Sequence, residues 1–187
     1  MGTTFGKPFA GLFQETEPRI VFFGLNYSGT SSILHHLKTG DTLSETSVLV
    51  GYDVGSFKYK NSSFSFFEIG EQCMYRDISV WKKYFEQASG FVFVVDSTYR
   101  ERIEDAQSLL YMVMDEIQGN APDNAAVLVY NNIHLVPGAA MTASEISNKL
   151  DLASLRQRNW QRNCSCSLCG YGIHEGFDWL SKNTARM

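Results

Sequence analysis

A glycine-rich stretch near the N-terminus has the outline of a phosphate-binding loop. The stretch GLNYSGTSSIL runs from Gly24 to Leu34, with four residues between Gly24 and Gly29. Backbone N–H groups of such a loop, at the start of a helix, attract anions without help from side chains. The pattern then requires a lysine that reaches the outer phosphates, and this chain has Thr30 there. Losing that charge-assisted hydrogen bond costs about 1.5–3 kcal/mol of binding free energy, so we expect weak phosphate binding. The favoured interpretation is a glycine turn that leads into a helix and binds no ligand.

The elements that would position this loop alternate between strand and helix patterns, which is typical of a single wound α/β domain. Asn61 and Ser62 form a turn-like pair between two strand patterns, and this predicts an antiparallel hairpin at one edge of the sheet. Thr142 and Glu145 form a capping box at the start of a helix. The predicted strands cover residues 19–25, 51–60, 63–70, 90–97, 125–132 and 160–166, and the predicted helices cover 31–38, 100–118, the segment after Thr142, and 173–183.

Length and composition limit the class of protein. The 187 residues suit one domain, and a chain that is 44% hydrophobic and 19% charged can form a full core. The net charge of -4 excludes a broad polycationic surface, so we expect no nucleic-acid partner. No segment approaches the roughly 18 apolar residues of a membrane span, and the N-terminus lacks a secretory or transit pattern. We therefore expect an intracellular protein, cytoplasmic or membrane-associated, with reduced cysteines.

Five ordered blocks of sequence carry a family resemblance: GLNYSGTSSILHHLKTG, YKNSSF, FVFVVDSTYRERI, SEISNKLDLASLRQRNW and HEGFDWLS. Their order resembles the ADP-ribosylation factor (Arf) family of small GTPases over nearly the whole chain. The resemblance implies a P-loop NTPase-like small GTPase fold of the α/β class, with a six-stranded, mostly parallel sheet and flanking helices. It also implies an amphipathic, often myristoylated segment at residues 1–16 and an Arf-like GTPase domain at residues 17–187, with a movable strand pair between two switch segments.

The resemblance assigns roles in binding phosphate and Mg²⁺ to particular positions. Ser31 stands where the family has a hydroxyl ligand of Mg²⁺, so part of a metal site could remain. The second hydroxyl ligand is a threonine in the family and Leu49 here, and a shift in register would bring Ser47 or Thr46 to that place. The positions that the resemblance assigns to the nucleotide, and that we regard as vestigial, are Gly24, Ser28, Gly29, Thr30, Ser31, Ser32, Gly70, Asn132 and Ser167.

The second switch segment differs from the family pattern. It opens with Asp-x-Gly-Gly-Gln in the family and with EIGEQ, Glu68 to Gln72, here. Glu68 could still accept hydrogen bonds from metal-bound water, one methylene out of place. Glu71 replaces a glycine beside the γ-phosphate, and like charges at about 4 Å repel by some 4 kcal/mol at an effective dielectric of 20. Gln72 matches the glutamine that positions the attacking water, and we regard it as a vestigial catalytic residue.

The guanine-binding motif is also changed. Asn-Lys-x-Asp becomes NIHL, so Ile133 replaces the lysine over the base and Leu135 replaces the aspartate that accepts the two base protons. A pocket that leaves buried donors of its ligand unpaired rejects that ligand by several kcal/mol. We expect Asn132 to tie this segment to the glycine loop, and the backbone N–H of Ser167 is a weak signal for contact with a base.

Together these changes favour an Arf-like pseudo-GTPase. We expect a protein-binding or structural module, as a stable subunit of a larger assembly, with little or no GTP binding, no GTP hydrolysis and no cofactor. The alternative is a divergent GTP-binding switch in vesicle or membrane traffic, which would use GTP or GDP with Mg²⁺ and hydrolyse GTP. A different anion or nucleotide in the pocket is a third possibility.

Two groups of hydrophobic residues could form interaction surfaces. Tyr52, Phe67 and Tyr84 match an aromatic cluster through which Arf-like proteins bind partners, and large aromatic side chains suit this role. Ordinary packing is the alternative, above all for Phe67. In the N-terminal segment, one helical face would dock on a membrane or on a protein surface, and Gly2 offers a myristoylation site. That face consists of Phe5, Phe9, Leu12 and Phe13.

A cluster of cysteines near the C-terminus resembles a metal site only loosely. Cys164, Cys166 and Cys169 lie close to His174, but their spacing is not that of paired zinc hooks. We expect Cys164 and Cys166 to share one face of a strand and to pack as small apolar residues, without a metal. We expect His35 and His36, on the helix after the glycine loop, to lie on the surface.

Overall fold

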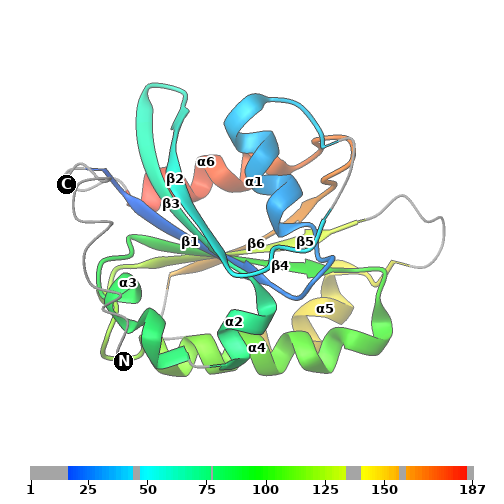
Figure 1. The fold of residues 1–187 in the computed structure, drawn as a ribbon. Coiled ribbons are helices and arrows are strands. Elements are labelled where there is room, and N and C mark those ends of the chain that lie inside the picture. The colour runs from blue at the N-terminus through cyan, green and yellow to red at the C-terminus, as the bar shows by residue number, and fades with distance from the viewer. Residues whose placement is uncertain (1–16, 44–46, 77, 134–139, 156–158, 185–187) are drawn as a thin grey trace.

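The described residues form one six-stranded sheet, as predicted, with helices on both faces (Figure 1). The computed structural model of the protein describes residues 17–43, 47–76, 78–133, 140–155 and 159–184. The strand order is β2-β3-β1-β4-β5-β6, in which β2 and β3 are antiparallel and all other neighbours are parallel. The strands are β1 (Arg19–Gly24), β2 (Tyr52–Tyr59), β3 (Ser62–Ile69), β4 (Gly90–Asp96), β5 (Ala126–Asn132) and β6 (Trp160–Ser165).

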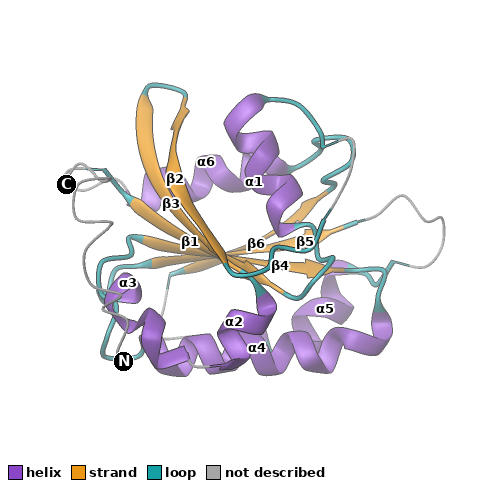
Figure 2. Cartoon of the chain, in the orientation of Figure 1, coloured by secondary structure: helices purple, strands orange, loops and turns teal. Residues whose placement is uncertain are grey.

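The helices divide between the two faces of the sheet. In Figure 2, α1 and α6 lie above the sheet, and α2, α4 and α5 lie below it. The α-helices are α1 (Thr30–Thr39), α2 (Glu71–Arg76), α3 (Lys82–Phe85), α4 (Ile103–Ile117), α5 (Ala143–Lys149) and α6 (Ile173–Thr184), and the 3₁₀ turns are η1 (Ile78–Trp81), η2 (Arg100–Arg102) and η3 (Leu152–Ser154). The capping box of α5 is confirmed, since Thr142 and Glu145 bond to each other's backbone N–H.

The central strands are buried on both faces, which explains their continuous apolar runs. Neighbouring residues of a strand point to opposite faces, so Phe22 packs in the cluster under α1 and α6 while Phe23 packs in the cluster under α4. Phe177 of α6 belongs to the first cluster and Leu110 of α4 to the second, and all four side chains are fully buried. The two clusters hold the sheet in place and thereby position the loops at the carboxyl ends of its parallel strands.

Several predicted boundaries were wrong by a few residues. The hairpin turn consists of Lys60 and Asn61, not Asn61 and Ser62, because Tyr59 pairs with Ser62 and Lys60 adopts a left-handed conformation (φ 53°). Strand β6 ends at Ser165, so Cys166 lies in the turn that follows and does not share a strand face with Cys164. The segment before β4 contains α2, η1 and α3, and none of these three short helices was predicted.

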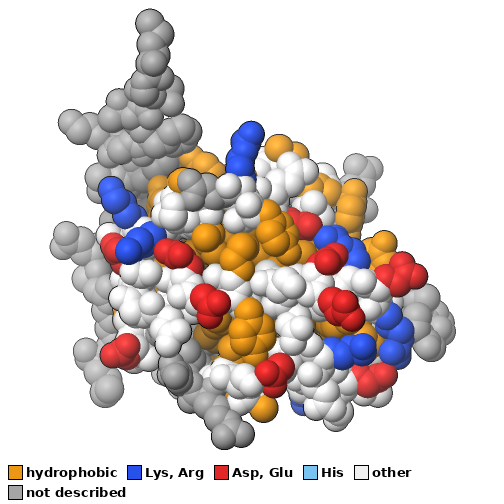
Figure 3. All heavy atoms as spheres, turned by 90° about the horizontal axis from the view of Figure 1, so that it is seen from below, with side chains coloured by type: hydrophobic (Ala, Val, Ile, Leu, Met, Phe, Trp, Pro, Cys, Tyr) orange, Lys and Arg blue, Asp and Glu red, His pale blue; other side chains and the backbone are white. Residues whose placement is uncertain are grey.

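The face below the sheet is partly apolar at its surface. Seen from below in Figure 3, exposed hydrophobic side chains lie between acidic and basic ones. Two large hydrophobic residues on the segments at this face are exposed, Tyr75 at 48% and Val80 at 55%. Among the described residues, no helix has the length and apolar character needed to cross a membrane.

Candidate functional site

The glycine loop lies at the carboxyl end of β1, where it connects the strand to the first turn of α1. Gly29 is the N-cap of α1 and has a φ of 93°, a left-handed conformation that favours glycine. A β-carbon at Gly29 would stand 2.1 Å from the side-chain nitrogen of Asn132. The loop therefore has the shape of a phosphate loop, and it is packed directly against the end of β5.

Asn132 ties its segment to the glycine loop, as predicted, and it also holds the turn that contains Ser167. Its side chain is fully buried, and its Nδ2 donates to the carbonyl oxygen of Ser28 at 2.8 Å and to the Oγ of Ser167 at 3.0 Å. Its Oδ1 accepts from the backbone N–H of Ser167 at 2.9 Å. The N–H of Ser167, a weak candidate for base contact, is therefore already bonded to Asn132.

The side chains at the positions of the family's lysine and metal ligands form hydrogen bonds within the protein. The hydroxyl of Thr30 lies 3.0 Å from that of Ser28 and carries no charge. The hydroxyl of Ser31 donates to the carboxylate of Glu68 at 2.5 Å. Burial raises the pKa of Glu68, and the hydrogen bond from Ser31 opposes that shift. The two side chains that would hold Mg²⁺ thus contact each other directly.

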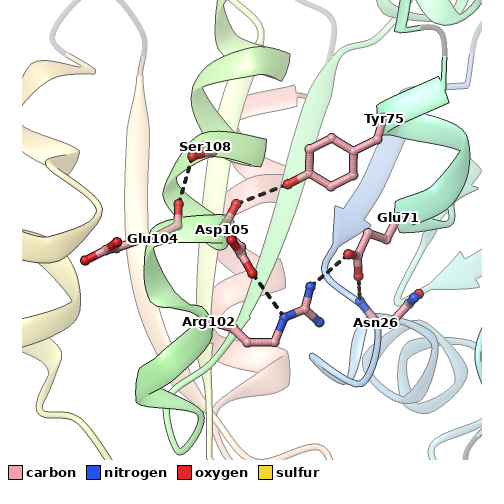
Figure 4. A network of polar contacts seen from close by, with 7 residues as sticks. All are labelled: Asn26, Glu71, Tyr75, Arg102, Glu104, Asp105 and Ser108. Atoms are coloured by element: carbon pink, nitrogen blue, oxygen red, sulfur yellow. Dashed lines mark hydrogen bonds and ion pairs between the residues drawn. The ribbon is translucent and has the colours of Figure 1, made fainter.

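The carboxylate of Glu71 binds a backbone N–H of the glycine loop (Figure 4). One carboxylate oxygen accepts from the backbone N–H of Asn26 at 2.5 Å, and the other lies 2.8 Å from the guanidinium of Arg102. The side chains of Glu71 and Arg102 are 14% and 26% exposed, so water screens this ion pair only in part. Arg102 also bonds to Asp105 of α4, and Tyr75 of α2 donates to the backbone carbonyl of Asp105. This network joins α2, α4 and the glycine loop.

A pocket of about 380 Å³ opens beside the loop. Three carboxylates line it, those of Glu68, Glu71 and Asp96, and no lysine or arginine does so among the residues that the structure describes. Leu49 also lines the pocket and approaches the second switch segment closely, since a β-carbon on Gly70 would stand 2.3 Å from the Leu49 carbonyl oxygen. The other predicted positions in its lining are Gly24, Ser28, Gly29, Thr30, Ser31, Ser32, Ser47 and Gly70.

These residues do not fit a triphosphate with Mg²⁺. The loop retains backbone donors, but the N–H of Asn26 already binds a carboxylate. The guanidinium of Arg102 is paired with that same carboxylate, and Arg102 does not line this pocket. An incoming polyanion would meet the uncharged Thr30 where the family has a lysine and the Glu71 carboxylate where it has a glycine, and like charges at about 4 Å repel by roughly 4 kcal/mol at an effective dielectric of 20.

The comparison with protein families agrees with the fold. The model of the ADP-ribosylation factor family matches residues 5–184. The chain belongs to the Arf family. Among solved structures, this Arf-family protein is similar to the Arl6 BBS3 small GTPase from Trypanosoma brucei, which was solved with the nucleotide analogue GppNp bound. The TM-score is 0.77 and the identity 27%, over 91% of this chain and 99% of that one.

The predicted aromatic cluster is present on the β2–β3 side of the sheet. Phe67 stacks on Tyr84 with ring centroids 4.3 Å apart, and Tyr52 lies 5.5 Å from Phe67. Trp81, which the sequence analysis had not included, contacts all three rings. Phe67 is only 5% exposed and Trp81 only 7%, so they form the base of the cluster, and Tyr52 and Tyr84 present its partly exposed edge.

Some predicted site residues lie elsewhere or outside the described residues. Gln72 is exposed on α2 and does not line the pocket. His36 was predicted to lie on the surface, which is wrong, since it is 8% exposed and its ring lies 5.2 Å from that of His174. Within the described part of the chain, no group of three His, Cys, Asp or Glu residues is placed to hold a metal. The predictions for Gly2, Phe5, Phe9, Leu12, Phe13, Thr46 and Leu135 lie outside the described residues.

Besides Trp81, the sequence reasoning missed Asn26 and Arg102. Asn26 contributes a backbone N–H, for which the side-chain type carries no signal. Arg102 lies 31 residues from Glu71 in the sequence, and only the fold brings the two together.

Proposed function

We propose that this Arf-family protein is a pseudo-GTPase, which uses the GTPase fold to bind protein partners and holds little or no GTP. The observation that carries the proposal is the carboxylate of Glu71 on the backbone N–H of Asn26, with its charge balanced by Arg102. An anion from the chain itself thus occupies a donor of the phosphate loop. The solvated triphosphate would have to displace this ion pair and would gain no lysine in return.

Further support comes from the rest of the pocket. Ser31 donates its hydroxyl proton to Glu68, so the carboxylate that would accept from metal-bound water already accepts a hydrogen bond from the chain itself. Ile133 and Leu135 cannot supply the charged groups that recognise guanine in the family. These losses concern three separate parts of the ligand, so no single replacement would restore them.

The proposed partner surface is the aromatic cluster of Tyr52, Phe67, Trp81 and Tyr84. The stacked, buried base holds the edge of the cluster rigid, and rigid aromatic side chains lose little conformational entropy on binding. In the sequence, α2 lies between Phe67 and Trp81 of this surface. The network around Glu71 and Arg102 connects α2 to α4 and to the glycine loop. We propose that the switch face therefore keeps one shape that needs no nucleotide.

The alternative is a working GTP-binding switch, and the nucleotide analogue in the similar Arl6 BBS3 structure favours it. The two functions separate by nucleotide content. The purified full-length protein is denatured, and the released nucleotide is quantified by chromatography beside a variant with Thr30→Lys, Glu71→Gly and Leu135→Asp. We expect no stoichiometric nucleotide from the wild type and an increase in the variant. One guanine nucleotide per wild-type chain would overturn the proposal.

The partner surface needs its own test. We expect the double variant Tyr52→Ala and Tyr84→Ala to lose proteins that co-purify with the tagged wild type from its native cells, while Tyr171→Ala retains them. Tyr171 is a suitable control because it is 67% exposed and lies in the turn before α6. Retention of all partners by the double variant would exclude this surface.

A further inference from the structure

The turn between β6 and α6 carries two cysteines three residues apart, Cys166 and Cys169. The backbone N–H of Cys169 donates to the carbonyl oxygen of Cys166 at 3.3 Å, and the N–H of Gly170 donates to the same oxygen at 2.8 Å. The N–H of Cys166 donates to the carbonyl of Tyr171 at 2.8 Å, which closes the turn. Such a turn holds the Cα atoms of its first and fourth residues within about 7 Å, and a disulfide requires about 4.4–6.8 Å. The turn therefore brings the two Cα atoms close to the separation that a disulfide requires.

The two thiols lie in different environments. Cys166 is 5% exposed, and Cys169 is exposed to solvent. Burial raises the pKa of the Cys166 thiol. A hydrogen bond from Cys166, and a second from the backbone N–H of Tyr171, lower the pKa of the Cys169 thiol. Cys169 is exposed and forms its thiolate more readily than the buried Cys166 does. This is the arrangement of an attacking and a resolving cysteine.

We propose that Cys166 and Cys169 form a reversible redox pair that exchanges with small-molecule disulfides such as oxidised glutathione. The Cys169 thiolate attacks one sulfur of the oxidant, whose S–S bond breaks and releases one thiolate. Cys166 then loses its proton to solvent and attacks the sulfur of Cys169, which releases the second thiolate. Two electrons pass from the cysteines to the oxidant, which leaves as two thiols after taking up two protons.

The two cysteines flank a residue that connects this turn to the end of β5. Ser167 lies between the two cysteines, and both its N–H and its hydroxyl bond to Asn132. Asn132 in turn donates to the carbonyl oxygen of Ser28 in the glycine loop. The covalent change would therefore occur beside the contact that joins the turn to the loop. The inference does not depend on whether the loop binds a nucleotide.

The test uses the full-length protein and mass spectrometry. The reduced protein is incubated with oxidised glutathione at neutral pH, quenched with acid, alkylated with N-ethylmaleimide and digested. We expect Cys166 and Cys169 to lose their alkylation together and to appear as one internal disulfide, which dithiothreitol reverses. Cys73 and Cys164, both half-buried, serve as internal controls and should remain alkylated.

Three variants test the order of the two steps. In Cys166→Ala the glutathione adduct on Cys169 should accumulate, because no resolving thiol remains, and in Cys169→Ser no adduct should form on Cys166. Cys164→Ser should behave as the wild type. Full alkylation of both cysteines in the oxidised wild type would overturn the proposal, as would a lasting wild-type adduct on Cys169 or a disulfide that includes Cys164. The wild-type experiment alone decides whether the Cys166–Cys169 disulfide forms, even if a variant fails to fold.

Discussion

Glu71 accepts a hydrogen bond from the backbone N–H of Asn26 at 2.5 Å, so the glycine loop holds a carboxylate of its own chain. The donor belongs to the loop and the acceptor to the first residue of α2, 45 residues later. Arg102 neutralises the carboxylate from the other side. The Glu71 carboxylate thereby joins the glycine loop to the first turn of α2 and to Arg102.

If this contact is structural, its removal should destabilise the protein. We expect Arg102→Met to lower the free energy of unfolding by about 1–3 kcal/mol, because it leaves the mostly buried Glu71 carboxylate without its charge partner. Urea denaturation followed by circular dichroism measures this change.

The matched control is Arg100→Met, in the same 3₁₀ turn. Arg100 pairs with Glu145, but both side chains are far more exposed, at 50% and 41%, so water screens this pair and we expect a clearly smaller loss of stability. Equal effects of the two substitutions would show that the Glu71 pair contributes no more than a surface ion pair.

Two adjacent asparagines of β5 should respond in opposite ways. Asn132→Ala should lower the free energy of unfolding by roughly 2–4 kcal/mol, because it leaves the Ser28 carbonyl and the Ser167 N–H without their partner and opens a cavity. Asn131 is 2% exposed, and neither polar atom of its amide has a hydrogen-bond partner among the residues that the structure describes.

Asn131→Leu should therefore be neutral or stabilise the protein by up to about 2 kcal/mol, since it replaces an unpaired buried amide with an apolar side chain of similar size. Thermal unfolding of Asn132→Ala and Asn131→Leu measures both changes in stability. A large loss for Asn131→Leu would indicate that the amide has a partner in solution.

Glu68 should make stability depend on pH. Its pKa is raised by burial, so the folded state binds a proton more tightly than the unfolded state does. The stability from this group is present below the ordinary glutamate pKa of 4.5 and is lost as the pH rises through the higher, folded value. Glu68→Gln resembles the protonated form, so its stability relative to the wild type should increase from pH 4.5 towards neutral pH. Urea titrations at several pH values measure this difference.

Glu86→Gln is the control for that series, because Glu86 is exposed at the end of α3. Its stability relative to the wild type should change little over the same range. A difference between Glu68→Gln and the wild type that stays constant with pH would contradict a raised pKa.

The sequence predicted the fold well because its signals are local. Continuous apolar runs mark β1, β4 and β5, which are buried on both faces, and the Thr142–Glu145 pair marks the start of α5. The irregular segment of α2, η1 and α3 was missed, because such short helices leave little periodicity.

The candidate site was predicted only in part. Asn132 was expected to hold the glycine loop, and it does. Glu71 was expected to repel phosphate, but its bonds to Asn26 and Arg102 could not be foreseen, since they depend on how three distant segments pack. Likewise, the exposure of Cys169 and the burial of Cys166 follow from where β6 ends, one residue earlier than its pattern suggests.

The most direct test of the central claim is a calorimetric titration of the nucleotide-free wild type with GTP in the presence of Mg²⁺. With no lysine in the loop and the Glu71 carboxylate on the Asn26 N–H, we expect no saturable binding, or a Kd above about 0.1 mM, which corresponds to less than roughly 5.5 kcal/mol. One-to-one binding of GTP with a Kd in the micromolar range or tighter would contradict the account.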